Sequence, residues 1–317
     1  MRLAVAVAVL LCGNQLGRSK GIALVAPSRL NRVALPPVNS IWMVEETSAR
    51  TLYSNGLTVR REYETESVPR RYHVYRRDTL QQSEAALTVP AGIVFHTTES
   101  EILPLEAARN SALLRSREDV LNHVRSGRCY NFVIDRFGQV SRIVPETQTA
   151  LHAGHSVWAS ADSVWIDLNE SFVGVSFEAE SNGQFEPSAA QMHSGRLLTE
   201  MLLARYGIPP SNCVTHAQVS VNPDNMRVGY HTDWGSAFPF EAMGLMEGYS
   251  LPLASVALFG FGHDDTFLGA IGNRPWPGLV AAEQQVRSRS AQEGITADEL
   301  KARLQQQYKT LRRQRHG

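Results

Sequence analysis

The feature that most constrains this chain is an alternation of short apolar runs with helical patterns between residues 88 and 247. The runs have the length of strands, whereas the segments between them repeat apolar residues every three or four positions. This alternation is typical of an α/β domain, in which helices cover a sheet. We expect strands at 92–97, 129–135, 140–144, 172–178 and 212–216.

The clearest helix is expected at 188–206. Leu197, Leu198, Met201 and Leu202 recur there at spacings of three and four residues, and Gly207 ends the pattern. These spacings place the four side chains on one face, which predicts that the helix packs against the sheet.

The segments on either side of this α/β region have different patterns. Residues 26–87 are expected to form a β-rich extension, with a two-residue hairpin turn at Asn55-Gly56. Arginine pairs at 70–71 and 76–77 favour an exposed edge strand protected by charge. Residues 248–317 are expected to form a second extension, helical from about 279.

Charge and cysteine content exclude several classes of protein. The 317 residues carry 31 Lys and Arg against 31 Asp and Glu, so no net field favours a nucleic-acid partner. The three cysteines form no C-x-x-C pair, which argues against a thiolate zinc site. Their spacing allows a Cys129–Cys213 disulfide bond but does not require one.

The beginning of the chain resembles an export signal. Arg2 precedes an apolar run from Leu3 to Cys12 that is too short to cross a bilayer but suits a signal peptide. We therefore expect residues 1–25 to be a signal peptide with its linker. The mature protein would then be exported to the periplasm, cell envelope or exterior, without an integral membrane segment.

Histidines concentrate in the α/β region, beside strands or in the loops after them. His96 and His216 each end an apolar run, so their rings are expected to meet at one edge of the sheet, and Asp233 follows in a loop. Two neutral imidazoles and a carboxylate leave one tetrahedral position on Zn²⁺ open to water, as in hydrolytic sites. A separation above a hundred residues is not itself a motif.

Six sequence blocks together resemble a known family. In chain order they are GIVFHTT (92–98), CYNFVIDRFG (129–138), LHAG (151–154), FVGVSF (172–177), TH (215–216) and HTDWGSAFP (231–239). They are similar to motifs of the zinc N-acetylmuramoyl-L-alanine amidases, the amidase_2 family, which includes phage T7 lysozyme and the peptidoglycan recognition proteins. The resemblance implies a mixed central β-sheet flanked by helices, within an amidase domain at 88–247.

The resemblance also assigns metal ligands and catalytic residues. It implies zinc ligands at His96, His216 and Asp233, the last being the Asp of AmpD-like members. Tyr130 occupies the position of a catalytic tyrosine. His231 stands near the developing oxyanion, where relatives have Lys or Thr; an ordinary loop histidine is the alternative reading.

Other positions match the family less closely. Ser176 replaces the general-base Glu of AmpD-like enzymes, and we expect it to contact substrate instead. Glu178 lies on the same strand face, about 7 Å along, and is a second candidate base. His152 is expected to line the cleft and bind substrate.

The implied activity is hydrolysis of the amide between N-acetylmuramic acid and the L-alanine of the stem peptide, with peptidoglycan or a muropeptide as substrate. Because Ser176 and His231 depart from the family pattern, a non-catalytic peptidoglycan-binding module is one alternative. A zinc hydrolase that acts on another amide is the second.

Overall fold

The computed structural model describes residues 41–181 and 186–316, with the side chain of His316 excepted. The expected signal peptide at 1–25 lies outside these residues. Within the described part of the chain, no helix is both long enough and apolar enough to cross a membrane.

The central sheet contains eight strands in the described ranges and is mixed, as expected. Its spatial order is β1-β2-β3-β7-β6-β10-β5-β11. The four strands β6, β10, β5 and β11 are parallel, whereas β7 runs antiparallel to β6. The strands of this sheet are β1 Met43–Glu46, β2 Arg50–Tyr53, β3 Thr58–Arg60, β5 Gly92–Thr97, β6 Phe132–Ile134, β7 Val140–Arg142, β10 Phe172–Phe177 and β11 Cys213–Thr215.

The two longest of these strands, β5 and β10, are buried along their whole length. Parallel strands covered on both faces read as continuous apolar runs, which is why the sequence located both of them well. Alternate residues of β5 enter different cores: Ile93 and Phe95 join one cluster, and Val94 joins the other. Both faces of the sheet therefore exclude water at its centre.

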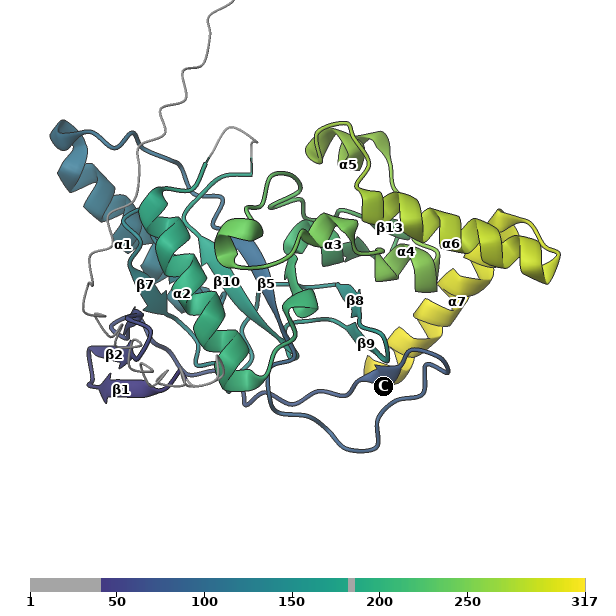
Figure 1. Ribbon diagram of the computed structural model, residues 1–317, viewed down its shortest axis with the longest axis horizontal. Coiled ribbons are helices and arrows are strands. Elements are labelled where there is room, and N and C mark those ends of the chain that lie inside the picture. Colours follow the sequence, from purple (N-terminus) through teal and green to yellow (C-terminus); the bar gives the residue numbers. More distant parts are fainter. Residues whose placement is uncertain (1–40, 182–185, 317) are drawn as a thin grey trace, which may run out of the picture. The chain divides into compact units, whose positions relative to one another are not determined.

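Helix α2, Ala189–Tyr206, confirms the helix expected at 188–206. Ser188 caps its first turn by accepting a hydrogen bond from the Gln191 main chain, and the Gln191 side chain completes a capping box. Gly207 ends the helix at φ +64°, a left-handed conformation that glycine adopts readily. The helix lies across the central strands (Figure 1), where its apolar face packs.

The N-terminal β-rich segment extends the central sheet. The expected turn at Asn55-Gly56 joins β2 to β3, with Gly56 at φ +87°. Strand β3 then pairs in parallel with β7, so β1 to β3 form one end of the eight-stranded sheet.

The prediction of an exposed edge strand around residues 70–77 was right about the edge position, because the strand at 75–76 lies at the edge of its sheet, but wrong about the exposure of most of the segment. Tyr72 and Tyr75 are buried, and the Arg70 side chain is only 1% exposed. Strand β4, Tyr75–Arg76, pairs with β9 in a small sheet that also contains β8. The guanidinium of Arg70 is buried because main-chain carbonyls surround it and accept its hydrogen bonds.

The C-terminal segment is helical where expected and packs onto the rest of the chain, but it also contains two earlier helices that the sequence did not predict, α4 Ala254–Phe259 and α5 Asp265–Ala270. Helix α6 begins at Pro277, close to the expected start at 279. In α7, Tyr308 packs its ring against Phe259 and Phe261. Figure 1 shows α6 and α7 beyond β8 and β9, on the side away from β1.

The remaining elements include three long helices, α1, α6 and α7, together with several short helices and strands. They are α1 Asn110–Gly127, α3 His216–Val219, α4 Ala254–Phe259, α5 Asp265–Ala270, α6 Pro277–Glu293, α7 Ala297–His316, β8 Val157–Ala159, β9 Ser163–Ile166, β12 Val221–Asn222 and β13 Arg227–Val228. Short 3-10 turns occur at η1 Ala107–Arg109, η2 Pro210–Asn212, η3 Glu241–Met243 and η4 Gly248–Ser250.

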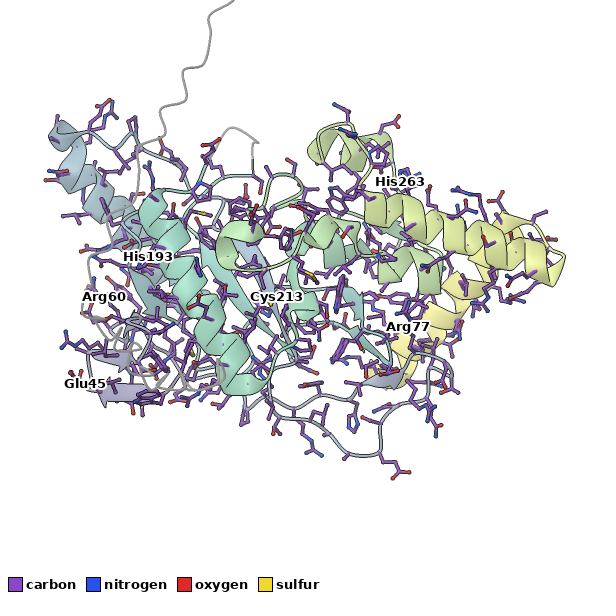
Figure 2. All side chains as sticks on the ribbon, in the orientation of Figure 1. Glu45, Arg60, Arg77, His193, Cys213 and His263 are labelled. Carbon is purple, nitrogen blue, oxygen red and sulfur yellow. The ribbon has the colours of Figure 1, made fainter. Side chains whose placement is uncertain are left out.

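Cys129 and Cys213 are both free thiols. Cys213 in β11 lies among packed side chains, as Figure 2 shows, and burial raises the pKa of its thiol. The disulfide bond that the spacing allowed is therefore absent between these two described cysteines.

Candidate metal centre

The three side chains expected to bind metal meet at one point. The Asp233 carboxylate lies between the two imidazoles, with Oδ2 3.0 Å from His96 Nδ1 and Oδ1 2.8 Å from His216 Nδ1. The candidate ligand atoms of the three residues all lie within 4.8 Å of one another. All three side chains are buried. The sequence prediction that these residues converge is therefore confirmed.

The topology of the sheet explains this convergence. His96 lies near the end of β5, and His216 begins α3 directly after β11, the parallel neighbour of β5. The carboxyl ends of the two strands therefore bring both rings to the same edge. Asp233 arrives from the loop after β13, where its carbonyl accepts a hydrogen bond from the Ala217 main chain in α3.

The protonation states of His96 and Asp233 at neutral pH suit the binding of a metal ion. Burial, assisted by the neighbouring His216, lowers the pKa of His96 to about 4. Burial would raise the pKa of Asp233, but the neighbouring imidazoles of His216 and His96 outweigh it and hold this pKa well below the usual range. His96 is thus neutral and Asp233 ionised at pH 7, the forms that ligate metals.

The donor set fits zinc. Two imidazole nitrogens and a carboxylate oxygen are ligands found in catalytic zinc sites, which keep a further position open. Magnesium and calcium prefer all-oxygen sites, so the two histidines favour a transition metal over either ion.

Tyr130 lies beside this triad, in a conformation that the sequence did not predict. Its ring centroid is 5.1 Å from that of His96, and its hydroxyl donates to the Thr97 carbonyl at 3.4 Å. Its φ of +62° is unusual for a bulky residue, so β6 starts at Phe132 instead of the expected 129. Burial and the nearby Asp233 carboxylate raise the pKa of Tyr130, which keeps the phenol protonated.

His231 lies on the outer side of the triad. Its ring stacks on His216 at 4.7 Å between centroids, while much of the side chain remains exposed. Its main-chain N–H donates to Ser220 Oγ at 3.0 Å, which fixes the loop. Burial and His216 lower the pKa of His231, so the ring is neutral at pH 7.

Ser176 and Glu178 occupy different environments. Ser176 pairs with His96 in the register of β10 and β5, next to the triad, but it has no exposed surface. Glu178 follows the end of β10 and accepts a hydrogen bond from the Arg136 main chain at 3.1 Å. Burial raises the pKa of Glu178. Its bonds therefore lead to the loop after β6 and away from the triad.

His152 contacts the triad directly. Its Nδ1 is 3.1 Å from His96 Nε2, and its Nε2 is 3.2 Å from the Phe172 carbonyl. Sequence reasoning missed two residues that hold it, Asn169 and Gly174. Two sequence signals could have found them: Asn169 precedes a buried strand, and Gly174 lies inside that strand, where a glycine indicates the close approach of another group.

Comparison with known proteins agrees with this site. Residues 86–236 match the family model Amidase_2, described as N-acetylmuramoyl-L-alanine amidase. The chain is 29% identical over 181 residues to the curated N-acetylmuramoyl-L-alanine amidase AmiD of Escherichia coli (strain K12). That similarity covers 53% of this chain and 57% of AmiD, so the chain spans little more than half the length of this relative.

Two solved structures are also similar. AmiD from E. coli, in complex with the substrate anhydro-N-acetylmuramic acid-L-Ala-D-gamma-Glu-L-Lys, is 22% identical with a TM-score of 0.37, over 53% of this chain and 61% of that one. AMPDH3 from Pseudomonas aeruginosa, in complex with anhydromuramic pentapeptide, is 19% identical with a TM-score of 0.37, over 71% and 76% of the two chains.

Proposed function

Because the segment 86–236 belongs to the Amidase_2 family, we propose that the protein is a zinc-dependent N-acetylmuramoyl-L-alanine amidase. It would hydrolyse the amide bond that joins N-acetylmuramic acid to the L-alanine of the peptidoglycan stem peptide. The observation that carries the proposal is the buried cluster of His96, His216 and Asp233, a complete set of three protein ligands. A module that only binds peptidoglycan has no need of such a set.

The three ligands define what a bound ion would contribute. Zn²⁺ held there would lower the pKa of a water molecule toward about 7 and polarise the scissile carbonyl. The buried Asp233 carboxylate supplies one negative charge, and neutral His96 supplies a lone pair without adding positive charge.

Tyr130 and His231 complete the proposed chemistry as hydrogen-bond donors. The Tyr130 phenol stays protonated, so it positions the attacking water and does not act as a base. Neutral His231 carries one N–H that can reach outward from its exposed ring toward the carbonyl oxygen as that oxygen gains negative charge.

Glu178 is retained as the candidate proton acceptor. Its raised pKa suits that role, since a base with a pKa nearer neutrality accepts a proton more readily. Its hydrogen bond to Arg136 faces away from the triad, so Glu178→Gln is expected to slow the reaction less than Tyr130→Phe.

The proposal includes export to the cell envelope or beyond. It rests on the apolar run from Leu3 to Cys12 after Arg2, and on a peptidoglycan or muropeptide substrate, which occurs in that compartment.

Product chemistry tests the proposed reaction. Purified sacculi are digested, and new amino termini are labelled and identified. We expect free L-alanine amino groups to accumulate without new reducing sugar ends, and His96→Ala to abolish this release. His193→Ala is the matched control, because His193 projects from α2 and is exposed (Figure 2). Intact sacculi with wild-type protein, or a different new amino terminus, would contradict the proposal.

A further inference from the structure

We propose that His152 is a positioning residue for the metal centre, and not the substrate contact that sequence comparison suggested. Its ring connects the Phe172 carbonyl at the start of β10 with His96 in β5. The inference rests on the metal centre of the proposed function. It assigns to His152 the control of which His96 nitrogen faces the metal.

The hydrogen-bond partners of the two rings determine which nitrogens of His152 and His96 carry protons. The Phe172 carbonyl only accepts, so His152 Nε2 must carry its proton. A neutral imidazole carries one proton, and His152 Nδ1 is therefore an acceptor, 3.1 Å from His96 Nε2. His96 Nε2 consequently donates, and His96 Nδ1 keeps a free lone pair.

That lone pair points at the candidate ligand cluster. His96 Nδ1 lies 3.0 Å from Asp233 Oδ2, so two acceptors face each other. A cation bound there would satisfy both acceptors. The alternative neutral tautomer has the His96 proton on Nδ1, and it would require His152 to donate from its own Nδ1 and to lose its hydrogen bond to the Phe172 carbonyl. His152 thus fixes the His96 tautomer in the form that ligates through Nδ1.

His152 is itself held by its surroundings. Asn169 Oδ1 accepts hydrogen bonds from the main chains of His152 and Ala153, at 2.9 and 2.7 Å. The ring lies against Gly174 in β10, where an added Cβ would lie 2.6 Å from His152 Cγ. Because both ring nitrogens are bonded and the ring rests on the sheet, His152 has little freedom to engage a substrate.

His155, three residues along the same loop, provides a contrast. It is exposed, with Nδ1 3.5 Å from Asp167 Oδ1 and Nε2 2.9 Å from Arg312 of α7. These contacts lead to Asp167 and α7 and away from the triad. Substitution of His155 therefore reproduces the loss of an imidazole from this loop without loss of the bond to His96.

Zinc affinity and its rescue test the assignment. The dissociation constant for Zn²⁺ is measured by competition with a chromophoric chelator for the wild type, His152→Leu, His152→Asn and His155→Leu. We expect His152→Leu to bind zinc about 10-fold to 100-fold more weakly, as for other residues that orient a ligand. His152→Asn, whose Oδ1 can accept from His96, should recover most of this loss, and His155→Leu should match the wild type. Wild-type affinity in His152→Leu would overturn the assignment.

Ring 15N chemical shifts of the wild type keep the proposal testable if His152→Leu fails to fold. We expect protons on Nε2 of both His152 and His96, and a proton on His152 Nδ1 would overturn the proposal. A wild type that binds no zinc would instead defeat the proposed function, and the nitrogen shifts would still decide the hydrogen-bond arrangement.

Discussion

Replacing Arg70 with methionine should destabilise the fold strongly. Its guanidinium donates to the main-chain carbonyls of Glu146, Gln148, Glu170 and Phe172, at 2.6 to 3.2 Å. Burial lowers its pKa to about 10, so it remains charged at pH 7. Without Arg70 the Phe172 carbonyl still accepts from His152 and the Gln148 carbonyl from Asn131, whereas the carbonyls of Glu146 and Glu170 lose their donor. A buried carbonyl left without a donor costs about 1–3 kcal/mol, so these two give a loss of about 2–6 kcal/mol.

Urea denaturation followed by tryptophan fluorescence measures this loss. Arg71→Met is the matched control, because Arg71 is the next residue and is exposed. We expect its free energy of unfolding to stay within about 0.5 kcal/mol of the wild type. Arg70→Lys should lie between the two, since one ammonium cannot reach all the carbonyls that the planar guanidinium reaches. Equal stabilities for Arg70→Met and Arg71→Met would refute the reasoning.

Three further predictions concern pH, packing and capping. His96 has a pKa of about 4 in the folded protein and about 6.5 in the unfolded chain, so the unfolded chain binds a proton at higher pH than the folded protein does. The free energy of unfolding of the metal-free protein should therefore fall by roughly 2 kcal/mol between pH 7 and pH 5. His96→Gln should remove this pH dependence in urea denaturation. Leu304→Ala empties a site in α7 that is 1% exposed and should lower the free energy of unfolding by about 2–5 kcal/mol, seen as a lower Tm. Ser188→Ala removes the α2 cap and should lower the free energy of unfolding in urea by about 1 kcal/mol. An unchanged free energy of unfolding would contradict the importance of this cap.

Local signals explain what the sequence predicted well. The strand at 92–97 matches β5 residue for residue, because a fully buried parallel strand is a continuous apolar run. The limits of α2 follow from a capping residue and a terminal glycine, which act within a few positions. The apolar runs before His96 and His216 predicted that their rings meet at one sheet edge, but more than a hundred residues separate the two, so the assignment of both as metal ligands with Asp233 depended on the family resemblance.

Non-local pairing explains what the sequence did not predict. The parallel pairing of β3 with β7 joins residues about eighty positions apart, and nothing in either short strand specifies its partner. Burial of Arg70 depends on carbonyls 76 to 102 residues further along, so a charged residue next to another arginine appeared exposed. The bond from His96 to His152 was hidden for the same reason, because it forms only when a loop folds over Gly174.

Zinc content measured together with the digestion of purified sacculi tests the central claim most directly. Elemental analysis and stem-peptide release are compared for the wild type and Asp233→Ala, which removes the carboxylate between the two imidazoles. The account predicts stoichiometric zinc and release of stem peptides by the wild type, and the loss of both in Asp233→Ala. Stem-peptide release by a zinc-free wild type, or undiminished zinc and release in Asp233→Ala, would contradict it.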